Sequence, residues 1–432
     1  QGIARYASHV LQFKPGSDVS LLNAILNSII SEALFDKQYV QANTEGFENL
    51  KNKIIAFSPE EMSQVCGIPA EKIKEVARIY AKSKASIIFW GMGISQHVHG
   101  TDNARCLISM ALTTGQIGRP GTGLHPLRGQ NNVQGASDAG LIPMLYPDYM
   151  SVEDNSTRSK YEKMWNTQLN PKKGLTVVEI IGAIHNNEIK GMYIQGENPA
   201  MSDPDQKHAR SALAKLEHLV VQDIFLTETA WHADVILPAT AHAEKSGTFT
   251  NTNREIQMAR AAINPPGQAR QDWELIQELA NRIGLNWNYS TLSEVFTEMT
   301  KVMPSLNNIT WDRLEREDSV TFPCDGPDLP GNEIIFGSGF PTKSGLGRIV
   351  PAEIVPPNEL PDEKYPMVLT TGRVLEHWHT GTMTRRSSTL DTLEPEAIAC
   401  LNQNDLKEMG IEPGHNIQVS TRRGEISLKA RQ

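Results

Sequence analysis

The chain has 432 residues, 39% of them hydrophobic, which is enough for about three globular domains with sizeable cores. Its 41 Lys and Arg residues against 50 Asp and Glu residues give a net charge of −9. This charge excludes general binders of nucleic acid or anionic membranes, because such proteins need a positive surface. There is no apolar run of membrane-spanning length and no signal-peptide pattern, so we expect a cytoplasmic protein with no nucleic-acid and no membrane partner.

The first third alternates helix signals with one apolar strand. A turn at 15–18 precedes a helix predicted over 21–33, and a capping box at 58–61 starts a second helix. Pro69 starts a third helix. The apolar strand 86–90 shows no alternation, which is typical of a parallel sheet covered by helices on both faces.

The middle of the chain repeats this pattern. Strands are predicted at 192–194, 219–221 and 234–237, with a helix over 209–216. Such βαβ units place ligands at the carboxyl ends of their strands.

After a proline-rich linker at 351–366, expected to be stiff and exposed, short strands are predicted at 367–370, 397–401, 417–419 and 426–428. We interpret them as an incomplete barrel. Because the chain starts at Gln1 without Met and stops within an alternating pattern, we expect a piece of a longer polypeptide.

The cysteines carry no metal motif. They are not arranged as C-x-x-C, so no iron–sulfur cluster, zinc ribbon or disulfide framework is expected, and all four are expected to be ordinary buried thiols: Cys66, Cys106, Cys324 and Cys400.

Glycine-rich and amide-rich segments follow the predicted strands. The run 91–96 begins Gly-Met-Gly, which suits either a phosphate or ring contact or a plain tight turn. The run 128–135 reads Arg-Gly-Gln-Asn-Asn-Val-Gln-Gly, and its guanidinium and amides suit a carboxylate or phosphate. An Asn-rich surface loop is the alternative for this second run.

Two further clusters are ambiguous. Asp223 at a strand end suits a ribose hydroxyl or a guanine edge, or else it caps the next helix. His377 and His379 lie on one strand face but have no third ligand nearby, so no metal ligand is predicted. The arginines at 373, 385 and 386 suit an anionic ligand, with a solvated charged hairpin as the alternative.

In this order, the segments 90–93, 128–135, 221–223 with 233–238, and 371–373 with His377 resemble the molybdopterin oxidoreductase family. Within it they are most similar to catalytic subunits of molybdenum- or tungsten-dependent formate dehydrogenases, of the cytoplasmic NAD-linked type. Arg128 before the Gly-Gln-Asn-Asn run is the most specific feature, because related nitrate reductases differ there.

The resemblance implies a cofactor, bis-molybdopterin guanine dinucleotide with Mo or W, and a catalytic role for Arg128 in binding the formate carboxylate. It also implies a set of positions near the pterins and nucleotides. These are Gly16, Met92, Gln96, Arg128, Gln130, Gly196, Glu197, Asn198, Gln222, Asp223, Thr227, Asp272, Arg373, His377 and His379.

The resemblance also implies an α/β fold. Its parts are an αβα unit over 1–130, a second Rossmann-like αβα unit over 131–347, and a linker with a double-psi β-barrel over 348–432. The family's 4Fe-4S cysteines and its Cys or selenocysteine metal ligand are absent, and are expected before Gln1; the piece alone is expected to be inactive.

In the intact protein, the resemblance implies that formate is oxidised to CO2 and that electrons pass to subunits carrying iron–sulfur clusters, flavin and NAD. Two alternatives stay open. One is a nitrate reductase that transfers an oxygen atom at the same cofactor, and the other is a scaffold subunit that keeps the fold without the chemistry.

Overall fold

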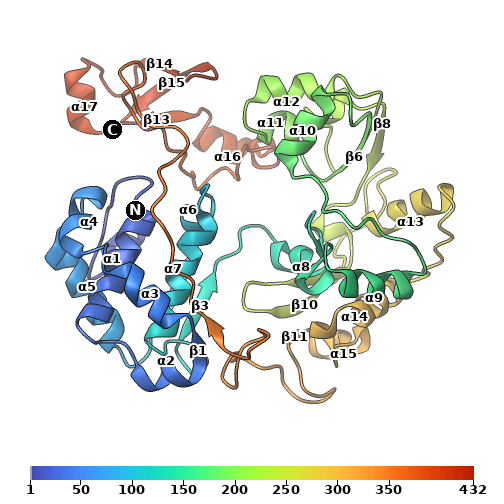
Figure 1. Ribbon diagram of the computed structural model, residues 1–432. Coiled ribbons are helices and arrows are strands. Elements are labelled where there is room, and N and C mark those ends of the chain that lie inside the picture. The colour runs from blue at the N-terminus through green and yellow to red at the C-terminus, as the bar shows by residue number, and fades with distance from the viewer. Residues whose placement is uncertain (1) are drawn as a thin grey trace.

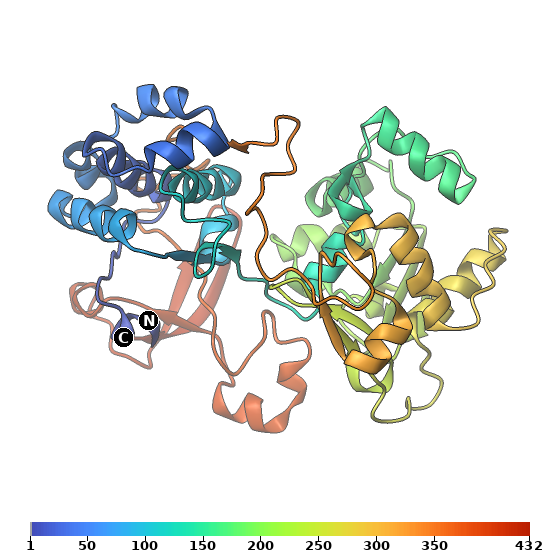
Figure 2. The ribbon, with the colours of Figure 1, turned by 90° about the horizontal axis from the view of Figure 1, so that it is seen from below.

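Residues 2–432, described by a computed structural model, form two lobes and a final region (Figures 1 and 2). The first lobe comprises residues 2–126 together with 336–354, the second lobe comprises 133–335, and the final region comprises 355–432. The loop 127–132 joins the two lobes. The overall class is mixed α/β, as predicted.

The first lobe is mainly helical. Its elements are α1 (Asp18–Ser31), α2 (Lys37–Asn43), β1 (Thr44–Glu45), α3 (Phe47–Ile54), α4 (Pro59–Cys66), α5 (Ala70–Lys82), β2 (Ile87–Trp90), α6 (Met92–Ser95), α7 (Gly100–Thr113), β3 (Gly123–Pro126) and β12 (Gly347–Arg348). Ser58 caps α4 by accepting a hydrogen bond from the backbone N–H of Glu61 at 3.3 Å, and Pro59 is the first residue of that helix, as predicted.

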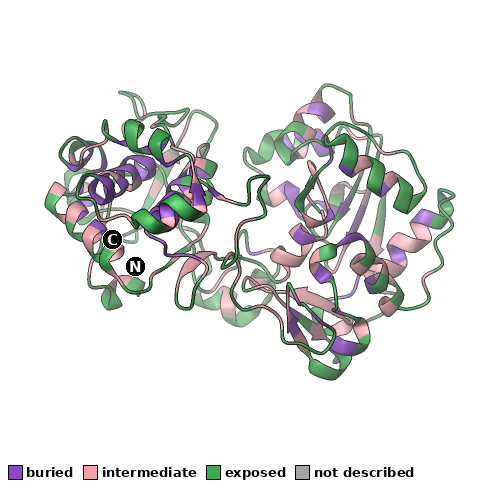
Figure 3. Cartoon of the chain, turned by 60° about the horizontal axis from the view of Figure 1, so that its bottom comes forward, coloured by how far each residue is buried: buried purple, intermediate pink, exposed green. Residues whose placement is uncertain are grey.

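Helix α1 lies at the centre of the first lobe's core. Leu26 and Ile29 are at most 1% exposed and belong to a buried apolar cluster that includes residues of α4, α5 and α7. Figure 3 shows that the helices of this lobe carry buried segments. A segment from much later in the chain also packs on this core. Strand β12 pairs in parallel with β1, and Asn23 donates a hydrogen bond to the carbonyl of Ala352 at 3.0 Å. The start of the predicted linker is therefore packed rather than exposed.

The second lobe contains the predicted βαβ units. Its elements are α8 (Val133–Asp138), β4 (Leu145–Tyr146), β5 (Met150–Ser151), α9 (Asn155–Trp165), α10 (Val177–His185), β6 (Gly191–Gln195), α11 (Pro199–Ser202), α12 (Gln206–Leu213), β7 (His218–Asp223), β8 (Val235–Pro238), β9 (Gly247–Thr250), β10 (Glu255–Ala259), α13 (Asp272–Arg282), α14 (Leu292–Val302), α15 (Trp311–Glu317) and β11 (Ser319–Thr321).

Strands β6, β7 and β8 pair in parallel and in sequence order, which confirms the three middle strands. Their carboxyl ends lie at one edge of the sheet, because Gln195 pairs with Gln222 and Asp223 pairs with Pro238. Any ligand bound at this edge meets residues from several strands.

Strand β2 departs from its prediction on one face. It pairs in parallel with β3, but Ile87 and Phe89 are 44% and 57% exposed. The expectation of helices on both faces is wrong here, because within residues 2–432 only one face of this two-stranded sheet is covered.

The final region contains α16 (Ser388–Leu393), β13 (Ile398–Cys400), α17 (Gln403–Glu408), β14 (Asn416–Ser420) and β15 (Glu425–Arg431). The last three predicted strands are confirmed as the sheet β13–β15–β14. The strand predicted at 367–370 is wrong: this segment has no pairing partner among the described residues, and Leu369 is 62% exposed.

The cysteines agree with the prediction in three of four cases. Cys400 is exposed, contrary to prediction, whereas the other three cysteines are buried. Within residues 2–432, no helix combines the length and the apolarity that a membrane crossing requires.

Candidate functional site

The carboxyl ends of β2 and β3 carry the first group of predicted site residues. Gly91 and Met92 follow β2 directly, and the side chain of Met92 is 44% exposed. A Cβ atom added to Gly91 or Gly93 would meet nothing within 4 Å, so the backbone is open to close approach by a ligand. A glycine turn of this kind suits a planar ring or a phosphate.

Gly16 and Gln96, both predicted to contact the cofactor, line the same cavity of about 260 Å³. Gly16 has φ +78°, a left-handed conformation that favours glycine. Asp18 also lines the cavity and is 5% exposed; burial raises the pKa of its carboxyl, although His97 lies 3.9 Å away. Sequence reasoning missed Asp18 and His97 as cavity residues.

Arg128 lies on the exposed loop that follows β3. Its Nε donates a hydrogen bond to Oε1 of Gln134 at 2.9 Å. Within residues 2–432, its two terminal nitrogens donate to no protein acceptor. The guanidinium is therefore fixed at Nε, and its two terminal nitrogens can donate two hydrogen bonds to one anion.

Gln130 connects the Arg128 loop to the final region. Its Nε2 lies 3.1 Å from Nε2 of His379, a residue 249 positions later in the chain. His379 has φ +50°, and its ring contacts that of Trp378 edge-on at 5.1 Å. Two predicted site residues from distant parts of the chain thus meet.

Asn198 lies just after β6 and is 6% exposed. Its Oδ1 accepts hydrogen bonds from N and Oγ1 of Thr229 at 3.1 and 2.8 Å. Its Nδ2 donates to Glu228 at 2.8 Å and to Thr382 of the final region at 2.9 Å. The hydrogen bond from Asn198 is the main cause that lowers the pKa of Glu228. Asn198 therefore holds the second lobe and the final region together.

The two residues before Asn198 are open to solvent. Gly196 has φ +62°, and a Cβ added there would meet nothing within 4 Å. Glu197 is exposed, and its Oε2 accepts a 3.3 Å hydrogen bond from the backbone of Asn198. This turn leaves room for a ligand beside the end of β6.

Gln222 is fully buried at the end of β7. It donates to Oδ1 of Asp272 at 2.7 Å and accepts from the hydroxyl of Tyr193. Asp272, at the start of α13, also pairs with Lys245. Because both ends of the Gln222 amide bind protein partners, this side chain is held in place and stiffens the sheet edge.

Asp223 and Thr227 complete the edge at β7. Oδ1 of Asp223 accepts hydrogen bonds from the backbone of Ile224 and Phe225 at 2.6 and 3.4 Å, and burial raises the pKa of its carboxyl. It forms this local turn rather than capping a helix, and Oδ2 has no hydrogen-bond partner among the described residues. Thr227 is buried and accepts from the backbone of Ala230 at 3.2 Å.

The final region reaches the site through residues 373–386. His377 contacts Oγ1 of Thr384 at 3.3 Å and the carbonyl of Glu394 at 2.7 Å, so it orders its own segment. Arg373 is exposed, and its guanidinium lies 6.0 Å from the Trp378 ring. Arg386 donates to the carbonyl of Leu226 at 3.2 Å and lies 4.6 Å above the ring of Phe225.

The residues near 380 therefore bring the candidate site together, because they contact the Arg128 loop through Gln130 and the strand-end loops through Asn198. In the view of Figure 1, α16 lies between the sheet β13–β15–β14 and the second lobe. Sequence reasoning missed Asn198's partner Thr382. It also missed Asp138 as a partner of Gln134, although their i, i+4 spacing on α8 was a usable signal.

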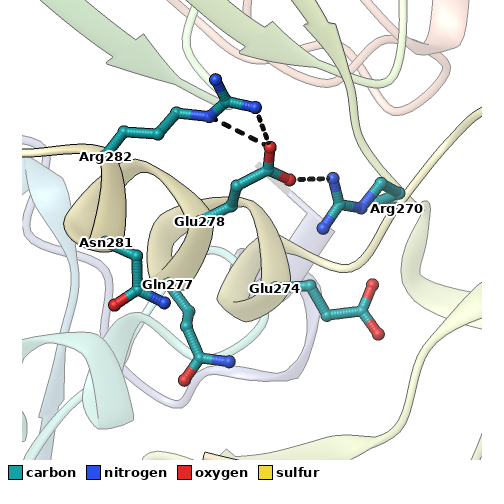
Figure 4. A pocket seen from close by; sticks show the side chains of 6 residues that line it. All are labelled: Arg270, Glu274, Gln277, Glu278, Asn281 and Arg282. Carbon is teal, nitrogen blue, oxygen red and sulfur yellow. Dashed lines mark hydrogen bonds and ion pairs between the residues drawn. The ribbon is translucent and has the colours of Figure 1, made fainter. Parts of the chain in front are cut away.

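Two observations limit the site. No group of three or more His, Cys, Asp or Glu residues suited to hold a metal occurs in residues 2–432. A hollow of about 640 Å³ lies beside α13 and is lined by none of the predicted residues (Figure 4). Among its lining residues, Glu278 pairs with Arg270 and with Arg282, each at 2.5 Å.

Comparison with known proteins decides the family. Residues 2–282 match the family described as Molybdopterin oxidoreductase, and residues 367–432 match the Molydopterin dinucleotide binding domain. The chain belongs to the molybdopterin oxidoreductase family. The predicted family is therefore confirmed, and so is a pterin dinucleotide as the class of cofactor.

The chain is 47% identical over 430 residues to the F420-dependent formate dehydrogenase subunit alpha of Methanocaldococcus jannaschii, covering 99% of this chain and 63% of the relative. It is 36% identical over 431 residues to formate dehydrogenase H of Escherichia coli, covering 99% of this chain and 60% of the relative. Its fold is similar to that of acetylene hydratase from Pelobacter acetylenicus, with a TM-score of 0.77, 20% identity, and coverage of 99% of this chain and 63% of the other. The chain thus spans somewhat less than two thirds of the length of these relatives.

Proposed function

We propose that the protein containing this chain is the catalytic subunit of a formate dehydrogenase, which oxidises formate to CO2 at a bis-molybdopterin guanine dinucleotide carrying Mo or W. The observation that carries the proposal is Arg128, on the loop that follows the parallel strand β3: Gln134 fixes its guanidinium at Nε, and both terminal nitrogens have no protein acceptor within residues 2–432. Relatives named as formate dehydrogenase subunits, 36–47% identical over 430–431 residues, support it.

The residues of this chain fit such a cofactor in three respects. Gly91, Gly129 and Gly196 each leave open space where a side chain would stand, so backbone amides are accessible to rings and phosphates. Arg373 is an exposed cation without an acidic partner among the described residues. The uncommitted Oδ2 of Asp223 suits a ribose or a guanine edge.

The predicted contacts divide into two groups under this proposal. Gly16, Met92, Gln96, Gln130, Gly196, Glu197, Asp223, Arg373 and His379 would touch the cofactor with side chains or open backbone. Asn198, Gln222, Thr227, Asp272 and His377 bind protein partners and would hold the first group in place. The amide of Asn198 is fully used by protein partners, so a cofactor contact from this residue would come from its backbone.

Two-electron oxidation of the formate C–H bond is the chemistry that such a metal centre supplies when bound, giving CO2, one proton and two electrons. The role of this chain's residues is to bind and orient formate. The free edge of Arg128 would bind the carboxylate with two charge-assisted hydrogen bonds and leave the C–H bond pointing away from the guanidinium. Because CO2 carries no charge, Arg128 would bind the product less strongly than formate.

Several finer points belong to the same proposal. We place the boundaries of the three units near 130 and 347, and we assign the sheet β13–β15–β14 to a double-psi barrel. The 4Fe-4S cluster and a cytoplasmic location stay predictions. The electron acceptor was predicted to be a partner with flavin and NAD. Because three relatives are named for F420, reduction of F420 and of NAD+ should be compared directly with the assembled enzyme.

The test is an assay of the purified holoenzyme with formate and an oxidised viologen dye, and separately with nitrate and the reduced dye. Turnover with formate alone supports the proposal, whereas turnover with nitrate alone assigns the protein to oxygen-atom transfer. Metal and pterin analysis of the same sample addresses the third possibility, since a sample without Mo, W and pterin would be a scaffold.

A further inference from the structure

Gln134, which contacts Arg128, is itself held on its other side. It lies on α8, and its Nε2 donates hydrogen bonds to Oδ1 of Asp138 at 2.6 Å and to the hydroxyl of Tyr149 at 3.2 Å. Asp138 is one helical turn later on the same face and only 5% exposed. A continuous chain of hydrogen bonds therefore runs from a buried carboxylate to the guanidinium.

The carboxylate decides which way the amide of Gln134 points. An ionised carboxylate accepts hydrogen bonds but donates none, so the NH2 group must face Asp138 and the carbonyl oxygen must face Arg128. The reversed amide would put its oxygen against the carboxylate and its NH2 against the guanidinium, and both contacts would be repulsive. Asp138 thus fixes the acceptor that Nε of Arg128 needs.

The surroundings keep this chain of contacts rigid. At the start of α8, Oδ1 of Asn132 accepts a 3.0 Å hydrogen bond from the backbone of Thr250. Asp148 and Tyr149 both have φ +58°, and Asp148 is held by the backbone N–H of Ser305 at 3.0 Å. Backbone held in this uncommon conformation by a tertiary contact gives Tyr149 a defined position.

We propose that Asp138 and Gln134 are positioning residues for Arg128: Asp138 orients the Gln134 amide, which in turn holds the guanidinium with its two terminal nitrogens directed at the substrate carboxylate. The proposal rests on the proposed function, in which Arg128 binds formate. Burial raises the pKa of the Asp138 carboxyl, while hydrogen bonds from Tyr149 and Gln134 favour its ionised form.

The test uses the holoenzyme with Asp138→Ala, Gln134→Leu and the near-isosteric Asp138→Asn, whose Oδ1 is still able to accept from Gln134. Ser137→Ala is the matched control on the same helix, because its hydroxyl donates only to the carbonyl of Val133 at 2.9 Å. We expect KM for formate to rise about tenfold in the first two variants with a much smaller change in kcat. Ser137→Ala should stay within about twofold of wild type, and Asp138→Asn, whose amide can pair with Gln134 in either orientation, should raise KM by less than Asp138→Ala. If Asp138→Ala does not fold, Gln134→Leu decides.

A double-mutant cycle separates positioning from general damage. Asp138→Ala added to Arg128→Ala should cause no further loss, because the residue that it positions is already gone. A full additional loss in that background, or an Asp138→Ala enzyme with wild-type KM, would overturn the proposal.

Crystal structures of the wild-type and Asp138→Ala holoenzymes give a readout that does not depend on activity. The proposal predicts that the 2.9 Å contact between Arg128 and Gln134 is lost or split between conformers in the variant, and an unchanged Arg128 would refute it. If the wild-type enzyme does not oxidise formate, the proposed function fails, but the crystal structures still decide whether Asp138 positions Arg128.

Discussion

The first lobe and the final region fix their site residues in different ways. In the first lobe, a continuous apolar core surrounds α1. The strands β2 and β3, which precede Gly91 and Arg128, pair with each other and pack against this core. In residues 356–432, the buried apolar side chains are Leu406 and Ala430, whereas Leu375 is 96% exposed. The final region is therefore held at the site mainly by a few polar contacts to the other parts of the molecule.

The candidate site therefore has two sides. The rigid side is the part that the core of the first lobe supports, and the docked side is the part that a few hydrogen bonds attach to the final region. Packing in a core makes the position of a side chain insensitive to any single hydrogen bond. A docked segment depends on individual contacts, here Gln130 to His379, Asn198 to Thr382, and Arg386 to Leu226. Substitutions that break one side and spare the other can test the distinction.

Arg128→Ala has the largest expected effect and acts on the rigid side. It removes two charge-assisted hydrogen bonds to formate, each worth about 1.5–3 kcal/mol, while the core that supports the loop stays intact. We expect kcat/KM for formate to fall at least tenfold with an unchanged melting temperature. Steady-state kinetics and thermal unfolding of the holoenzyme check both parts, and near-normal kcat/KM would contradict the role of Arg128.

Asn198→Ala should weaken the attachment of the final region to the second lobe. It leaves the buried N–H of Thr229 without its acceptor and removes the bond to Thr382, which together cost about 1–3 kcal/mol. We expect a lower melting temperature and faster proteolysis in the linker 351–366. Asn404→Ala, at an exposed position on α17, is the control; equal proteolysis of the two variants would show that Asn198 does not hold the final region.

Gln130→Ala should weaken docking less. The residue is exposed and makes one contact of 3.1 Å with His379, which is worth about 0.5–1.5 kcal/mol. Proteolysis of the linker 351–366 should accelerate by less than in Asn198→Ala. Gln168→Ala, at an exposed position beyond α9, is the control, and an effect larger than that of Asn198→Ala would reverse the order of the two contacts.

Glu278→Gln, outside both sides of the site, has the smallest expected effect. Hydrogen bonds from Arg270 and Arg282 lower the pKa of Glu278 to about 2, below its usual value of 4.5. A carboxyl whose pKa is lowered on folding stabilises the protein above its unfolded pKa, and this stabilisation is lost as the pH falls toward about 2. Thermal unfolding should show a slight loss at pH 7 that shrinks at acidic pH, with formate kinetics unchanged; a loss that grows on acidification would be inconsistent with this ion pair.

The sequence predicted much of the framework, because local signals decide it. Ser58 and Pro59 start α4 as their residue types require, and the apolar runs after 191, 218 and 234 form a parallel sheet. The strand-end position of Gly196 and Asp223 followed from that sheet. These features depend on neighbours in the chain or on a repeated βαβ pattern, so one sequence is sufficient.

The failures concern contacts that no local pattern records. The apolar segment 367–370 has the composition of a strand but pairs with none of the described residues, and Phe89 lies on a sheet face that those residues leave uncovered. The meeting of Gln130 with His379 spans 249 positions. Asn198 and Gln222 were predicted as cofactor contacts from resemblance, but only the structure reveals that their amides are used by protein partners.

Under the proposed function, the cofactor site is complete only when the final region docks on the second lobe. The most direct measurement is the content of molybdenum or tungsten and of pterin per polypeptide in the purified enzyme carrying both Thr382→Val and Arg386→Ala, with Glu278→Gln as control. These substitutions remove the hydroxyl that accepts from Asn198 and the guanidinium that donates to Leu226, and neither alters the Arg128 loop. The account predicts that metal and pterin content fall by half or more in the double variant while the control keeps its full content. Full cofactor content in the double variant would contradict it.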